Sequence, residues 1–249
     1  MRVARKGGST RLKRLAAPIT YRVPRKTGKW VVRVRPGPHP SWRSIPIAIL
    51  LRDVLNIAQT LREVKYILRK GYVHVDGKPI KDYRYPIGLM DVILLTPTNE
   101  AYRMLPAKKY LIYPYRIDKD GDRNIKLLRI KNKVMVKRGR IQLTTHDGRN
   151  FLYTMDDKYS SLKPGDVLVY NVVDKKVVDY IKFDSGVLAL VTGGSKIGTV
   201  AKIIEVRKPD PLKPKLVKLD TDEFGEFETI FDYVFPVGRE RPVIGLYPT

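Results

Sequence analysis

Hydrophobic residues at helical spacing predict two short helices in the first third of the chain. In the first helix, the apolar positions recur on one face: Ile47, Leu50, Leu51, Val54 and Ala58. We expect Ser44 to be its N-cap and Pro46 to lie in its first turn. The second helix opens with a capping box, Thr60 to Glu63, in which each side chain binds the other's free backbone amide. It ends before Gly71.

The second helix separates its apolar and basic residues onto different faces. Its apolar stripe consists of Leu61, Val64, Ile67 and Leu68. Arg62, Lys65 and Arg69 follow each other at i, i+3 and i+7 on another face. The pattern predicts a helix that packs on one side and presents charge on the other. By itself, such a basic face can equally be solvated.

Alternating residues after this helix predict a hairpin and one further strand. The segments Tyr72 to Val75 and Lys78 to Ile80 flank the pair Asp76-Gly77. An Asp-Gly pair is typical of a type I′ turn, because glycine tolerates the positive φ that this turn requires. A strand from Asp91 to Leu95 would complete the unit.

Between Tyr110 and Val173 the pattern changes to short strands, which predicts a small β-domain. Turn signals at Asn132, Gly139 and Asp147-Gly148 separate the strands that we expect at 127–130, 133–136, 140–143 and 150–153. One side of the alternation is basic: Arg129, Lys131, Lys133, Lys137, Arg138 and Arg140. A side with this charge fits a surface that faces phosphates.

The last part of the chain combines a glycine-bearing loop with an acidic block. Two hydrophobic strands, one at 187–191 and one that contains Ile203, Ile204 and Val206, flank the loop 192–200, which contains Lys196 and Gly198. From Asp220 to Asp232 six carboxylates alternate with three phenylalanines, and no lysine or arginine occurs between Leu219 and Gly238. This block is expected to fold back on the chain's own basic surface, to meet a basic protein neighbour, or to form a solvated acidic edge.

Positive charge is concentrated at the start of the chain. The 249 residues carry a formal net charge of +24, and fourteen lysines and arginines precede the first carboxylate, Asp53. Because such a segment repels itself, we expect a polyanion-binding arm that is disordered in isolation. A solvated basic tail without a partner is the alternative. Trp30 and Trp42, beside arginines, could stack on unpaired bases or pack against the first helix.

Composition and residue spacing disfavour a metal site, a phosphate-binding loop for nucleotides and a membrane-spanning segment. The chain has no cysteine, and its three histidines are not at metal-binding spacing from one another. Gly193 and Gly198 are spaced as in a phosphate-binding loop, but Thr199 stands where the lysine is required. No apolar run approaches the ~20 residues that span a bilayer, and no secretory signal is evident. Nucleic acid is therefore a better candidate polyanion than anionic lipid.

The order of elements from Ser44 to Leu105 resembles the alpha-L RNA-binding module of some ribosomal proteins, pseudouridine synthases and tyrosyl-tRNA synthetases. The resemblance includes the Val-x-Val-Asp-Gly hairpin and the run from Pro86 to Ile93. It implies that the second helix and the hairpin form a face for structured RNA, which here comprises Arg62, Lys65, Arg69, Lys70 and Lys78. The last two strands and their loop resemble the KOW motif of SH3-like barrels, with Gly198 as its key glycine and Lys196 in its loop.

The order of all these parts resembles the S-four-e family of small-subunit ribosomal proteins from archaea and eukaryotes. The segments Gly8 to Pro18 and Gly37 to Pro40 are similar to that family's opening, and the length and first residues favour its archaeal branch. The resemblance implies a structural constituent of the small subunit that binds and stabilises folded rRNA, without catalysis, cofactor or metal. Its partners would be small-subunit rRNA and neighbouring ribosomal proteins of the cytoplasmic ribosome, not a membrane or a small-molecule substrate.

We therefore predict an α+β fold built from several modules. Residues 1–43 would be an extended basic arm, 44–106 the alpha-L module, 107–173 a basic β-rich domain, and 174–249 an SH3-like KOW barrel with the acidic segment. We expect these residues to bind RNA: Arg2, Arg5, Lys6, Arg11, Lys13, Arg14, Arg22, Arg25, Lys26, Arg43, Arg62, Lys65, Arg69, Lys70, Lys78, Lys133, Lys137, Arg138, Arg140 and Lys196.

Two rival functions remain open at this point. An RNA-modifying enzyme needs a carboxylate in a closed pocket, and Asp91 is the best candidate. The aspartate that follows a Gly-Arg pair in pseudouridine synthases is absent after both Gly139-Arg140 and Gly148-Arg149. A translation or transcription factor that uses the KOW segment is the second rival.

Overall fold

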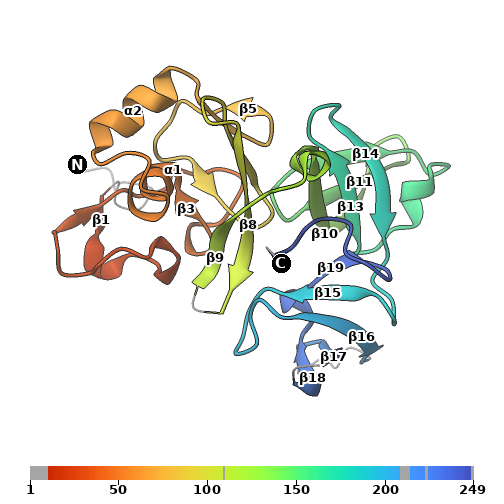
Figure 1. The fold of residues 1–249 in the computed structure, drawn as a ribbon. Helices are drawn as coiled ribbons and strands as arrows, with labels where there is room; N and C mark the ends of the chain where they lie inside the picture. Colours follow the sequence, from red (N-terminus) through yellow and green to blue (C-terminus); the bar gives the residue numbers. More distant parts are fainter. Residues whose placement is uncertain (1–10, 109, 208–213, 222–223, 248–249) are drawn as a thin grey trace, which may run out of the picture.

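The computed structural model describes residues 11–108, 110–207, 214–221 and 224–247. The fold is rich in strands, most of which belong to three five-stranded antiparallel sheets (Figure 1). The first sheet and its helices follow the N-terminal segment, and the middle and last sheets share one hydrophobic core. Within the described residues, no helix has the length and apolar character needed to cross a membrane.

Residues 11–43 fold against the rest of the chain and do not form the extended arm that their charge predicts. Strand β1 (Leu12–Lys13) pairs with β2 (Trp30–Val31), and short 3-10 helices cover Arg14–Ala16, Ile19–Tyr21 and Ser41–Arg43. Tyr21 is only 1% exposed, and its hydroxyl accepts a hydrogen bond from Val34 N at 3.4 Å. Apolar residues between the cations bury in the first core, and this outweighs repulsion among side chains that remain at the surface.

The first predicted helix is shorter than its apolar pattern suggests. Strand β3 (Ile45–Pro46) pairs with β6 (Pro86–Ile87), and α1 (Ile47–Ile49) continues as a π-helix over Leu50–Val54. Pro46 is the N-cap, whereas Ser44 donates its hydroxyl to Pro40 O at 2.9 Å, so the expected cap was wrong. The helix stops before Ala58 because Asn56 adopts a positive φ of 54° and turns the chain.

The second helix, α2 (Leu61–Arg69), confirms the predicted capping box and its two faces. Glu63 N donates to Thr60 Oγ1 at 3.3 Å, and the Glu63 carboxylate accepts the Gln59 amide at 2.8 Å. The hydrogen bond from Gln59 and that from the Thr60 hydroxyl lower the pKa of Glu63. Val64 and Leu68 are fully buried, while Arg62 and Arg69 are exposed.

The first sheet has the order β5-β4-β7-β8-β9. Its strands are β4 (Val73–Val75), β5 (Lys78–Pro79), β7 (Val92–Leu95), β8 (Glu100–Ala107) and β9 (Tyr110–Arg116). Asp76 and Gly77 have φ values of 49° and 70°, which confirms the predicted turn. The domain boundary expected after residue 106 falls inside β8, one residue before its end, and would separate β8 from its partner β9.

The middle sheet has the order β12-β11-β10-β13-β14. Its strands are β10 (Ile125–Val136), β11 (Arg140–Thr145), β12 (Asn150–Tyr153), β13 (Val167–Asn171) and β14 (Lys176–Ile181). The two strands expected on either side of Asn132 are one strand, β10, with an irregular register between Ile130 and Asn132. Its first half pairs with β13 and its second half with β11, so a bulge and not a turn changes the strand's direction.

The last sheet has the order β18-β17-β16-β15-β19. Its strands are β15 (Leu188–Val191), β16 (Val200–Val206), β17 (Leu216–Thr221), β18 (Gly225–Ile230) and β19 (Val234–Gly238). Buried residues of this sheet, such as Val191 and Phe235, share a core with Leu127 and Val167 of the middle sheet. The middle and last sheets therefore form a single packed unit, beside which the first sheet lies (Figure 1).

Candidate nucleic-acid interface

Eleven of the predicted RNA-binding residues lie exposed at the surface, as a phosphate contact requires. They come from the N-terminal segment, α2, the hairpin β4–β5 and the turn between β10 and β11: Arg11, Lys13, Arg25, Lys26, Arg62, Arg69, Lys70, Lys78, Lys137, Arg138 and Arg140. Arg2, Arg5 and Lys6 lie outside the described residues.

The other six predicted residues are half-buried and contact groups of the chain itself. Arg14 donates to Thr27 Oγ1 at 2.7 Å, and Lys133 Nζ donates to Ser160 O at 2.5 Å. The remaining four cations lie over aromatic rings at 4.0 to 4.8 Å from the centroids: Arg22 over Tyr113, Arg43 over Trp42, Lys65 over Tyr83, and Lys196 over Phe227. These contacts hold the side chains in place, and sequence spacing alone did not indicate them.

The described part of the acidic block folds back on basic residues of its own module. The ammonium of Lys196 lies over the rings of Phe224 and Phe227. Glu226 pairs with Lys218 at 2.5 Å, and Glu228 pairs with Arg207. Asp220, Glu226, Glu228 and Asp232 remain exposed, so the described part of the block is an acidic hairpin edge on which two carboxylates pair with cations of the same module.

In the module that contains the first sheet, the surface formed by α2 and the β4–β5 hairpin combines cations with aromatic rings. Tyr66 on α2 is 59% exposed, and the Lys70 ammonium lies 5.6 Å from its ring centroid. Tyr72, at the start of the hairpin, is also exposed. Lysine or arginine next to an exposed ring offers both a phosphate contact and a stacking surface, a pairing common at RNA interfaces.

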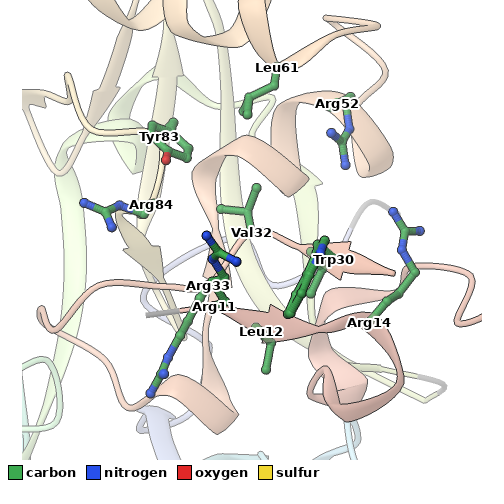
Figure 2. A pocket seen from close by; sticks show the side chains of 11 residues that line it. Arg11, Leu12, Arg14, Trp30, Val32, Arg33, Arg52, Leu61, Tyr83 and Arg84 are labelled. Atoms are coloured by element: carbon green, nitrogen blue, oxygen red, sulfur yellow. The ribbon is translucent and has the colours of Figure 1, made fainter. Parts of the chain in front are cut away.

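Three basic grooves involve the N-terminal segment, with volumes of 620, 670 and 520 Å³. The first runs between β1, β2, the π-helix and the start of α2 (Figure 2). Trp30, which is 45% exposed, lies in it, and Trp42 is 56% exposed. Neither indole is buried against the first helix, so both keep ring surface that faces solvent.

A buried ionic cluster joins the parts that carry these surfaces. The Nζ of Lys126 lies 2.6 Å from carboxylate oxygens of Asp76 and Asp91 and 3.2 Å from Asp147. Arg149 Nη2 binds Asp76 at 2.8 Å, and His39 Nε2 lies 2.9 Å from Asp91. The N-terminal segment, the first module and the middle sheet each supply members, so the cluster fixes how the three parts are placed.

The charges in this cluster are set by burial and by one another. Burial alone would raise the pKa of Asp91, but His39 and Lys126 hold it well below its ordinary value. Burial alone would also raise the pKa of Asp147, but Lys126 and His146 lower it to about 2. Burial lowers the pKa of His146 to about 4, so this imidazole is neutral at pH 7. The carboxylates of Asp91 and Asp147 are therefore ionised and compensated within the fold.

Asp91 cannot serve as a catalytic carboxylate in this arrangement. It is 1% exposed, and its oxygens already accept bonds from His39, Lys126 and the Gly88 amide. A general base must reach its substrate within hydrogen-bond distance. The position expected for an RNA-modifying enzyme thus belongs to the structural cluster.

Comparisons with known proteins find three matching family models and a similar solved structure. The chain matches the model of ribosomal family S4e over residues 98–177, the RS4NT domain over 6–41 and the S4 domain over 47–93. It is similar to the crystal structure of the 30S ribosomal protein S4e from Thermoplasma acidophilum, with a TM-score of 0.66 and 34% identity. That match covers 79% of this chain and 95% of the other.

Curated relatives match almost end to end. The chain is 42% identical over 245 residues to small ribosomal subunit protein eS4 of Ignicoccus hospitalis, covering 96% of each. It is 40% identical over 248 residues to the protein of the same name from Methanocaldococcus jannaschii, covering 98% of this chain and 100% of the relative. With this identity across the N-terminal segment and all three sheets, the chain belongs to ribosomal family S4e.

Proposed function

We propose that this protein is a structural component of the small ribosomal subunit that binds small-subunit rRNA and stabilises its folded form. The family is not enzymatic, and its members named above are small-subunit proteins, which supports a place in the cytoplasmic ribosome beside neighbouring ribosomal proteins. The observation that carries the proposal is the exposed set of lysines and arginines, spread over the N-terminal segment, the S4 domain and the β10–β11 turn.

Several separate surfaces fit a large folded RNA better than a short duplex. Phosphates of different helices converge where an rRNA is compact, and cations held at fixed distances by one rigid protein neutralise that repulsion. The buried cluster around Lys126 keeps the S4 domain, the N-terminal segment and the middle sheet in register. In this proposal the eleven exposed cations, together with Arg2, Arg5 and Lys6, contact rRNA phosphates.

The half-buried cations have a second role in the same proposal. Lys133, Arg22 and Lys65 position loops and rings beside the RNA surface while keeping their charge close to it. Lys196, in the loop between β15 and β16, lies over the rings of Phe224 and Phe227 and so holds the acidic hairpin against this loop. The loop that carries it corresponds to a KOW motif in an SH3-like fold, and Gly198 has the positive φ of 85° that favours glycine there.

The domain division is also a proposal, adjusted to the sheets. We assign β9 to the S4-containing module and β14 to the middle domain, because each strand pairs within those sheets. The N-terminal segment up to residue 43 and the last module keep the roles proposed from the sequence.

The binding proposal is tested by titrating folded small-subunit rRNA with the full-length protein at several salt concentrations. With ~6 to 10 phosphate contacts, affinity should fall about 10³- to 10⁵-fold between about 50 and 200 mM salt. Ribosomal particles sedimented from the source cells should contain the protein stoichiometrically. A flat salt response, or transient presence at substoichiometric levels as expected of a translation factor, would overturn the proposal.

A further inference from the structure

We propose that the 620 Å³ groove around Trp30 binds a single unpaired nucleotide of the RNA, with its base stacked on the indole and its phosphate held by arginines. This inference rests on the proposed function and adds a specific kind of site to it. The other exposed cations contact phosphates of any helix, whereas this groove selects a nucleotide that has left its stack.

The lining of the groove has the chemistry that such a nucleotide requires. Among its eleven lining residues none is an aspartate or glutamate, and five are arginines: Arg11, Arg14, Arg33, Arg52 and Arg84. These come both from the N-terminal segment and from the module beside it (Figure 2). Asp53 pairs with Arg52 at 2.7 Å and Asp82 approaches Arg84 at 3.8 Å, so a clear positive excess remains.

Trp30 supplies the surface for a base. It is 45% exposed, and the cationic groups of Arg11 and Lys29 lie 5.8 and 5.5 Å from its ring centroid. Its strand, β2, pairs with β1, and this holds the backbone of the residue in place. Leu12, Val31, Val32 and Leu61 line the groove with apolar surface, so a base entering it also leaves water.

The shape of the groove favours an unpaired nucleotide over a helix. Bases in an A-form helix are stacked on both faces, and only their edges and the backbone are accessible. A recessed indole therefore meets a base face only where the nucleotide is bulged, in a loop or at an end. The volume lies in the range of roughly 300 to 1,000 Å³ of pockets that enclose small ligands.

The test uses Trp30 as its own reporter. The chain has two tryptophans, so the full-length Trp42→Phe variant emits from Trp30 alone. It is titrated with an RNA hairpin that contains one bulged nucleotide and with a fully paired hairpin of equal length. We expect the bulged hairpin to quench Trp30 emission strongly and the paired hairpin to bind with little quenching.

Matched variants separate stacking from general binding. The Trp30→Phe variant emits from Trp42, which lines none of the three grooves, and should respond equally to both hairpins. Trp30→Ala should weaken binding of the bulged hairpin by roughly 5- to 150-fold and leave the paired hairpin within about twofold. Because Trp30 is partly exposed, the circular dichroism and melting temperature of both variants should match the unsubstituted chain.

Other outcomes overturn the inference. Equal quenching by both hairpins means that the groove contacts backbone only. Stronger quenching by adenosine monophosphate than by RNA identifies a site for a free nucleotide, and quenching by polyglutamate identifies a site for an acidic peptide. If neither hairpin binds in a salt-dependent way, the proposed function fails as well, and that result is distinct from the loss of Trp30 selectivity.

Discussion

The Nζ of Lys126 lies 2.6 Å from the carboxylate of Asp91, and both side chains are buried. Lys126 belongs to β10 of the middle sheet, and Asp91 precedes β7 of the first sheet. Two sheets that bury most of their apolar residues separately are thus connected by an ion pair without access to water.

Removing the cation from this cluster should be strongly destabilising. Lys126→Met leaves Asp76, Asp91 and Asp147 close together without their shared partner, and losing one member of a buried ion pair costs about 3 to 5 kcal/mol. Urea unfolding of the full chain measures the loss. The exposed Lys137→Met should change stability by less than about 0.5 kcal/mol, and a similarly small loss for Lys126→Met would show that the cluster contributes little.

Stability should fall as the pH is lowered, in two stages. His146 is neutral in the fold and has its pKa lowered to about 4, so protonation favours the unfolded chain between about pH 6.5 and 4. Asp147, with its pKa lowered to about 2, adds a loss between about pH 4 and 2. Unfolding free energies measured across these ranges check the prediction.

The contribution of His146 can be separated from that of the other histidines. His146→Gln should remove the pH dependence of the unfolding free energy between about pH 6.5 and 4. The variant His74→Gln, on β4, should retain this dependence. If the unfolding free energy of His146→Gln changes with pH in this range as steeply as that of the unsubstituted chain, another group causes the loss of stability.

The capping box of α2 offers a local test. Thr60→Ala removes the acceptor for the Glu63 amide and should cost about 1 kcal/mol of stability. The neighbouring Gln59→Ala, which keeps the backbone amide that Glu63 binds, should be close to neutral. Equal losses in both variants, measured by urea unfolding, would contradict a specific capping role.

Gly88 tests how the N-terminal segment is attached. A Cβ at this position would lie 2.3 Å from Cγ of His39, so Gly88→Ala should displace the imidazole from Asp91. Limited trypsin digestion should then cut within residues 11–43 several times faster. Gly121→Ala, where nothing lies within 4 Å of the added atom, should leave the cleavage rate unchanged.

The basic face of the S4 domain should account for part of the salt dependence. Replacing Arg62, Arg69 and Lys78 together by glutamine should reduce the slope of log affinity against log salt by about 2 to 3. Replacing the exposed Lys175, in the β13–β14 turn, and Lys176, at the start of β14, should have less effect. The reverse order of effects would move the interface to the middle domain.

Local patterns predicted local structure well in this chain. The capping box and apolar stripe of α2 and the Asp76-Gly77 turn depend on residues close in sequence, and all three were confirmed. The short first helix and the bulge before Asn132 were missed. The helix ends because Asn56 adopts a positive φ, which the apolar pattern does not indicate, and the bulge depends on the pairing of β10 with two distant partners.

The buried cluster had no signal in the sequence. Lys126 occupies a strand rich in lysine and arginine, and nothing nearby distinguishes it from the solvated cations. Its three carboxylates come from separate loops between residues 76 and 147. Charge counting therefore predicted the polyanionic partner but not which charges face the protein interior.

The burial of Tyr21 and the bond from His39 to Asp91 have a consequence for the thermodynamics of assembly. Residues 11–43 lose their conformational entropy when the protein folds. This entropy cost therefore does not reduce the affinity for RNA. Association through this segment should then proceed as rigid docking, with a smaller heat-capacity change than coupled folding and binding would produce.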